Sequence, residues 1–143
     1  MASITIKDMC VSYNKGKSYV LEKMNLTVED GEFCVFLGPS GCGKSTAMHC
    51  IAGLLEPIDG QIHFGSEMMT ETAGGKKKTF VPPQERNIAM VLQEYALYPN
   101  MTVRENMSFA LKTKKAPKEE IETRVDYMSK TLSIDHLLDR PFQ

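Results

Sequence analysis

Residues 38–46 constrain the fold of this chain more than any other part of its sequence. They read Gly-Pro-Ser-Gly-Cys-Gly-Lys-Ser-Thr and match the pattern Gly, four residues, Gly-Lys-Ser/Thr, in which backbone N–H groups surround a phosphate. Such a loop lies between a strand and a helix. The apolar run 33–37 predicts a strand buried on both faces, and the helical spacing of apolar residues over 47–55 predicts the helix. The sequence therefore predicts an α/β fold with a phosphate-binding loop.

The loop residues have distinct expected roles. The glycines leave the backbone free to curl around a phosphate because they carry no side chain. Lys44 and Ser45 stand in the first turn of the helix, where free N–H groups attract negative charge. We expect Lys44 to bind the β- and γ-phosphates and Ser45 to bind Mg²⁺. The predicted nucleotide contacts in this loop are Gly38, Pro39, Ser40, Gly41, Cys42, Gly43, Lys44, Ser45 and Thr46.

Composition narrows the class of protein. The 143 residues carry a net charge of −1, with 24% charged and 42% hydrophobic residues, which argues against a nucleic-acid-binding protein and against a disordered chain. No signal peptide is recognisable and no apolar run approaches the about 18 residues of a membrane span. The cysteines lack C-x-x-C spacing, so we expect reduced thiols at Cys10, Cys34, Cys42 and Cys50.

The first 80 residues also predict β-structure. Apolar residues alternate with polar ones over 4–13 and 20–28, which indicates antiparallel strands, and 61–65 indicates a further strand. Tyr13 ends the first of these segments, where it is a candidate to stack on a purine or is a half-buried strand tyrosine. The following segment is less regular, and we interpret the lysine-rich stretch 74–78 as a solvated loop.

A second apolar run is followed directly by a polar residue, Gln93. Residues 88–92 predict another buried parallel strand, and Gln93 follows at its carboxyl end, where ligands bind in α/β sheets. Gln93 is a candidate for a second Mg²⁺ contact, or a plain strand-end glutamine. The apolar and aromatic residues 95–99 then form a loop of the kind that meets a partner.

Two helices are predicted after this loop. Thr102 and Glu105 have the spacing of a capping box, which opens a helix through Leu111. Pro117, followed by two glutamates, opens another helix, with apolar residues at helical steps over 121–132. We interpret these apolar residues as packing positions.

In combination, these features resemble the ATP-binding subunits of ABC transporters. Tyr13 precedes a loop, the glycine-rich pattern follows, and Val91-Leu-Gln-Glu-Tyr-Ala-Leu-Tyr-Pro99 comes before Val103-Arg-Glu-Asn106. The Gly-Cys-Gly and Tyr-Ala-Leu-Tyr-Pro segments look most like importers of sugars and related solutes. The resemblance covers essentially the whole chain. It implies a P-loop NTPase core with an antiparallel N-terminal subsheet over 1–93, and the start of a helical subdomain over 94–143, truncated before the signature motif.

The resemblance also implies roles for single residues. Tyr13 would stack on the adenine of ATP, and Lys44 with the loop backbone would hold the phosphates. Ser45 and Gln93 would surround Mg²⁺, with Gln93 also sensing the γ-phosphate. Lys44 and Gln93 are thus the implied catalytic residues of a P-loop ATPase.

Partners follow from the same resemblance. The loop from Glu94 to Asn100 would lie against a cytoplasmic helix of a membrane permease. Two ATPase subunits, in a homodimer, would couple ATP hydrolysis to solute import under two permease subunits. The protein would be cytoplasmic and peripheral at the cell membrane, which it would reach only through the permease.

Several family motifs do not occur in the 143 residues: the Leu-Ser-Gly-Gly-Gln signature, the aspartate-ended strand with its catalytic glutamate, and the switch histidine. Because these groups stabilise the transition state, we expect the chain to bind Mg-ATP and hardly hydrolyse it. The alternatives are a non-hydrolysing module that binds nucleotide or permease, a non-transport ATPase of this family, and a small P-loop kinase. The dispersed arginines argue against the kinase, which would need an arginine-rich lid.

Overall fold

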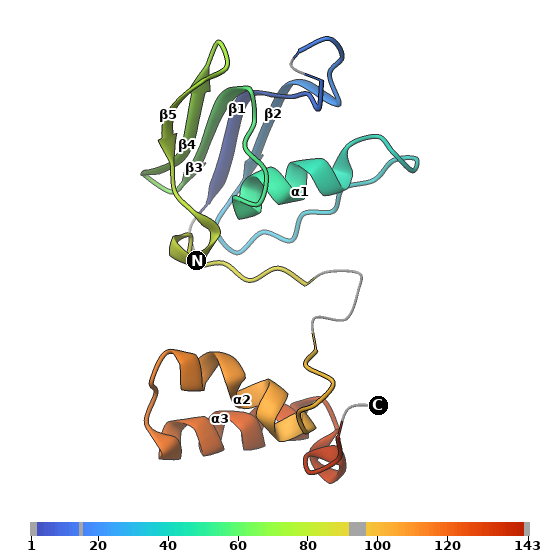
Figure 1. The fold of residues 1–143 in the computed structure, drawn as a ribbon, viewed down its shortest axis with the longest axis vertical. Coiled ribbons are helices and arrows are strands. Elements are labelled where there is room, and N and C mark those ends of the chain that lie inside the picture. Colours follow the sequence, from blue (N-terminus) through green and yellow to red (C-terminus); the bar gives the residue numbers. More distant parts are fainter. Residues whose placement is uncertain (1–2, 15, 92–96, 142–143) are drawn as a thin grey trace. The chain divides into compact units, whose positions relative to one another are not determined.

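The computed structural model describes residues 3–14, 16–91 and 97–141. The chain divides into two compact units, Met1–Met90 and Val91–Gln143. The first unit holds five strands and helix α1, and the second holds helices α2 and α3 (Figure 1). The assignment of 1–93 and 94–143 to an ATPase core and a helical subdomain stays a prediction.

The first unit is built on an antiparallel sheet with the strand order β2-β1-β3-β4-β5. β1 lies between β2 and β3, so that Ile4 pairs with Val28 on one side and with Phe64 on the other (Figure 1). The predicted antiparallel opening and the strand predicted at 61–65 are therefore confirmed. The strands are β1 (Ile4–Val11), β2 (Leu21–Val28), β3 (Asp59–Phe64), β4 (Glu67–Ala73) and β5 (Lys76–Phe80).

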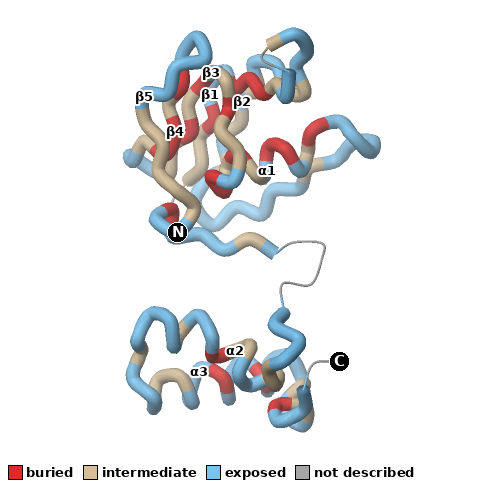
Figure 2. Tube along the Cα trace, in the orientation of Figure 1, coloured by how far each residue is buried: buried red, intermediate tan, exposed pale blue. Residues whose placement is uncertain are grey.

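The core of this unit forms where α1 (Lys44–Ala52) packs against the sheet. Figure 2 shows buried residues on the central strands and along α1. Ile6 and Ile62 come from neighbouring strands, and Ala47 and Cys50 come from the helix. Burying an isoleucine-sized side chain contributes about 1.5–3 kcal/mol, so this apolar contact helps to hold α1 on the sheet.

Two predicted strands are wrong. Residues 33–37 form no strand, and Phe33 and Leu37 are 91% and 88% exposed. Residues 88–91 form no strand either, with Val91 93% exposed, and Leu92 lies outside the described residues. A strand buried on both faces needs paired neighbours and covering helices. Within the described ranges, no segment pairs with either run, so the apolar sequence alone did not produce a strand.

The predicted loop at 74–78 is also corrected. β4 and β5 form a hairpin in which Ala73 pairs with Lys76, leaving Gly74 and Gly75 as a two-residue turn. Both glycines have positive φ, +57° and +72°, as the tightest hairpin turns require. The three lysines at 76–78 therefore lie on a strand at the edge of the sheet.

The second unit contains α2 (Val103–Thr113), α3 (Lys118–Thr131) and a 3-10 turn, η2 (Asp135–Leu137). Both predicted helices are confirmed. The predicted capping box is present as well, since the Glu105 N–H donates to Thr102 Oγ1 at 3.2 Å and the Thr102 N–H donates to Glu105 Oε2 at 2.8 Å. Across the described ranges, no helix combines the length and the hydrophobicity that a membrane span requires.

Candidate functional site

The loop of residues 38–46 leads directly into α1, whose first residue is Lys44. Gly43 precedes the helix with φ of +95°, a conformation that other residues rarely adopt. A Cβ atom on Gly43 would lie 2.7 Å from Leu21 Cδ2 and 3.2 Å from the Val20 carbonyl oxygen. Glycine is therefore required here both by the backbone and by the close approach of β2.

The Lys44 ammonium spans this loop. Its Nζ donates to the carbonyl oxygens of Gly38 at 2.8 Å and Pro39 at 2.7 Å, and lies 3.5 Å from Cys42 Sγ. These contacts join the end of the loop to its beginning. They fix a positive charge against the loop backbone.

The amino-terminal end of α1 adds to the positive potential. The first N–H groups of a helix have no intrahelical acceptor, and the helix dipole places partial positive charge there. Gly43 supplies no side-chain cap, and the first turn of α1 contains no acidic residue. The exposed Ser45 hydroxyl stands in this same turn. A loop, an ammonium and an uncapped helix end thus meet, and together they suit an anion with several oxygens.

The structure places Tyr13 beside this loop. Its hydroxyl lies 3.2 Å from Thr46 Oγ1, on the first turn of α1. Tyr13 follows the end of β1 and is 67% exposed, which is more than the half-buried strand tyrosine would be. Its ring is accessible for stacking on a planar ligand.

Gln93 lies outside the described residues, and so do Glu94, Tyr95 and Ala96. The Mg²⁺ contact and the sensing role expected for Gln93 stay predictions. Among the residues that the structure describes, no cluster of three or more His, Cys, Asp or Glu side chains could hold a metal ion.

The described part of the aromatic loop is held by one side chain. Asn106 accepts from the Tyr98 N–H at 2.8 Å and donates to the Tyr98 carbonyl oxygen at 3.1 Å. The Tyr98 ring lies 4.6 Å from the Phe109 ring. Leu97 and Tyr98 nevertheless stay 43% and 44% exposed.

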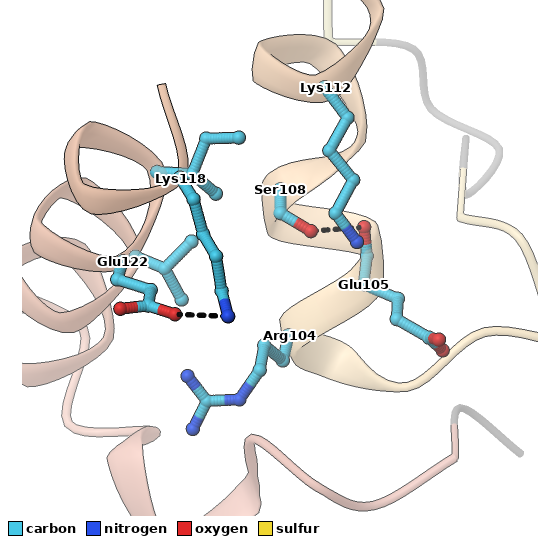
Figure 3. A pocket seen from close by; sticks show the side chains of 8 residues that line it. Arg104, Glu105, Ser108, Lys112, Lys118 and Glu122 are labelled. Carbon is cyan, nitrogen blue, oxygen red and sulfur yellow. Dashed lines mark hydrogen bonds and ion pairs between the residues drawn. The ribbon is translucent and has the colours of Figure 1, made fainter. Parts of the chain in front are cut away.

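A pocket of about 220 Å³ lies between α2 and α3 (Figure 3). Three of its charged groups have partners: Lys118 Nζ lies 3.8 Å from Glu122, and Arg104 contacts Asp139 at 3.3 Å. Glu105 is engaged in the capping box, which lowers the pKa of its carboxyl through the backbone and side-chain hydrogen bonds with Thr102.

Sequence reasoning missed Arg86. Its side chain is 3% exposed and donates to the carbonyl oxygens of Cys50 and Ile51 at the end of α1. A single arginine after a polar turn carries no periodic signal, so its burial could not be predicted from the sequence pattern.

Comparison with protein families decides the relationship. The model of the ABC transporter family matches residues 21–143. The chain belongs to the ABC transporter family.

Curated ABC relatives align over 140 residues, or 98% of this chain. The maltose/maltodextrin import ATP-binding protein MalK of Vibrio cholerae is 44% identical, and the trehalose/maltose import protein MalK of Thermococcus litoralis is 45% identical. The sn-glycerol-3-phosphate import protein UgpC of Rhizobium meliloti is 46% identical. The chain spans 35%, 36% and 37% of the lengths of these proteins.

Solved structures of ABC proteins agree with this fold. The protein cbiO1 of Clostridium perfringens, part of the ABC transporter complex cbiONQ, has a TM-score of 0.78 at 28% identity. The ATP-binding cassette MJ0796, solved as a dimer bound to ADP and Pi, has a TM-score of 0.72 at 25% identity. Each comparison covers 96% of this chain, and 53% and 61% of those chains. The predicted α/β fold of the ABC ATPase type is thus confirmed.

Proposed function

We propose that this chain binds Mg-ATP at residues 38–46, as the nucleotide-binding part of an ATPase subunit for sugar import. The observation that carries the proposal is the Lys44 ammonium, fixed across the loop at 2.7–2.8 Å from two carbonyl oxygens at the uncapped end of α1. This arrangement suits the β- and γ-phosphates of ATP.

The surrounding residues complete the proposed site. Tyr13 stacks on the adenine, since its exposed ring lies beside the first turn of α1. Ser45 contributes a hydroxyl oxygen, the kind of ligand that Mg²⁺ prefers, and Gln93 is the second proposed Mg²⁺ contact. The Mg²⁺ ion would neutralise phosphate charge during hydrolysis. Lys44 binds the phosphates and thereby fixes their position in the loop.

The proposed cellular setting draws on the relatives, whose names describe ATP-binding proteins for import of maltose, trehalose and sn-glycerol-3-phosphate. We infer a permease partner that meets the loop from Glu94 to Asn100, a second ATPase subunit, and a position at the cytoplasmic face of the membrane. The exposed Leu97 and Tyr98 side chains support the permease contact.

A second candidate function is nucleotide binding without turnover. The described groups of the proposed site, Lys44 and the first turn of α1, bind phosphate in the ground state as well as in the transition state, so they account for binding without turnover. Tight Mg-ATP binding without phosphate release would favour this function. Steady phosphate release that Lys44→Ala abolishes would favour the ATPase.

The nucleotide site is tested by calorimetry of Mg-ATP binding to the purified protein. Replacing Lys44 with Ala should raise the Kd by about tenfold or more, because a charge-assisted bond to phosphate is worth about 1.5–3 kcal/mol. Lys7→Ala is the matched control, since Lys7 is an exposed lysine on β1. An unchanged affinity in Lys44→Ala would refute the phosphate site.

A further inference from the structure

Arg86 uses every hydrogen-bond donor of its guanidinium within the first unit. Arginine has five N–H groups, and each has an acceptor here. Nε donates to the Val81 carbonyl at 2.8 Å, Nη1 donates to the carbonyls of Cys50 at 3.0 Å and Ile51 at 2.8 Å, and Nη2 donates to the Met69 carbonyl at 3.4 Å and Thr70 Oγ1 at 2.7 Å.

These acceptors belong to separate parts of the fold. Cys50 and Ile51 lie in the last turn of α1, where the helix dipole is negative and carbonyl groups lose their usual partners four residues on. The Cys50 carbonyl also accepts from the N–H of the C-cap Gly53 at 3.1 Å. Met69 and Thr70 lie in β4, and Val81 follows β5. One cation therefore ties the carboxyl-terminal end of α1 to the far half of the sheet.

The surroundings of Arg86 fit this role. Its Cζ atom lies 5.2 Å from the centre of the Phe80 ring, at cation–π distance. A Cβ atom on Gly53 would lie 2.5 Å from Arg86 Nε, so only glycine lets the guanidinium reach the helix end. Within the described residues Arg86 forms no ion pair with a carboxylate, so its role does not depend on an acidic partner.

We propose that Arg86 is a positioning residue for the nucleotide site, acting through α1. The inference rests on the Mg-ATP site proposed above. α1 has nine residues, and a helix of this length is a rigid rod of about 14 Å. A tilt of about 5° at the end held by Arg86 would move the opposite end by about 1 Å. Lys44 and the first N–H groups stand at that opposite end, where hydrogen bonds to phosphate tolerate little displacement.

The first test measures Mg-ATP affinity in Arg86→Lys. Lysine keeps the charge but offers three donors on one atom, so it cannot hold both the end of α1 and β4 as the guanidinium does. We expect the Kd for Mg-ATP to rise by about tenfold, while the circular dichroism spectrum stays that of the folded protein. In Arg86→Ala, added methylguanidinium should restore part of the affinity, and methylammonium should not.

A destabilised control separates positioning from stability. Cys10→Gly removes a buried side chain from β1 that lies outside the core cluster shared with α1, and its side chain has no hydrogen bond to α1. The two variants are compared at temperatures where equal fractions are folded. If Cys10→Gly loses as much affinity as Arg86→Lys, Arg86 acts only through stability and the inference is overturned.

The second test reads the loop without nucleotide. Amide signals of ¹⁵N-labelled Gly41 and Gly43 should shift in Arg86→Lys and stay in place in Cys10→Gly. Unshifted signals in Arg86→Lys would overturn the inference whether or not ATP binds. If the unaltered protein fails to bind Mg-ATP while these signals still shift, the proposed function fails and the positioning of the loop stands.

Discussion

Cys50 shows how burial at the end of α1 changes the chemistry of a single residue. Its side chain is fully buried next to Arg86. Burial raises the pKa of the Cys50 thiol to about 12, and the Arg86 charge opposes this in part. The neutral thiol is therefore the form that the core accommodates.

This shift predicts a loss of stability at alkaline pH. The folded pKa is raised above the unfolded value of about 9, so the stability linked to the thiol is fully present below pH 9. It is lost as the pH rises from about 9 to about 12. Urea unfolding at pH 8, 10 and 11 should show a steeper loss in the unaltered protein than in Cys50→Ala. Equal pH slopes in the two proteins would contradict the assignment.

At the scale of elements, Gly41 and Gly43 of the loop before α1 differ in the space that surrounds them. Gly41 and Gly43 have φ of +81° and +95°, but a Cβ atom would meet nothing within 4 Å at Gly41 and would clash with Leu21 at Gly43. Alanine at either position destabilises the fold by about 1–2 kcal/mol, because a residue with a Cβ atom is strained at positive φ. Gly43→Ala should lose clearly more free energy of unfolding than Gly41→Ala in urea titrations. Equal losses would show that β2 yields to the added methyl group.

The start of α2 gives a second prediction at this scale. Thr102→Ala removes the side-chain cap and should lower the free energy of unfolding by about 1 kcal/mol, as measured by urea titration.

The same cap should depend on pH. Because hydrogen bonds with Thr102 lower the pKa of Glu105, the cap weakens as the pH falls through that lowered pKa. The helical circular dichroism signal should therefore fall less on acidification in Glu105→Gln than in the unaltered protein.

These elements show what the sequence could predict. The capping box at Thr102 and Glu105 depends on residues three apart, so local spacing was sufficient. The run 33–37 depends on neighbours that pair with it, and its apolar composition could not supply them. Arg86 was missed because its five acceptors come from segments far apart in the chain. Within the candidate site, the loop and Lys44 followed from a local motif, whereas the support beneath α1 required the folded sheet.

At the scale of the whole molecule, the exposed apolar run 33–37 predicts self-association. Phe33 and Leu37 are nearly fully exposed, whereas the edge strand β5 carries three lysines that discourage pairing between sheets. The double variant Phe33→Ser, Leu37→Ser should reduce light scattering at high protein concentration. Tyr127→Ser is the control, since Tyr127 is a 69% exposed aromatic on α3, outside the run 33–37. If only Tyr127→Ser reduces the light scattering, the surface that mediates self-association lies outside residues 33–37.

The strand order of the sheet has a consequence for synthesis on the ribosome. β1 can pair with β2 as soon as both strands have emerged from the ribosome. Its other neighbour, β3, is synthesised later, so Ile4 can pair with Phe64 only after β3 has emerged. Residues 38–46 and α1 are translated between these two events. Pairing between such distant segments is slow because a long loop must close first. A nascent chain that stalls before β3 thus exposes the glycine-rich segment before the sheet beneath α1 is complete. Nucleotide binding at the proposed site would stabilise the fold only after β3 has paired with β1.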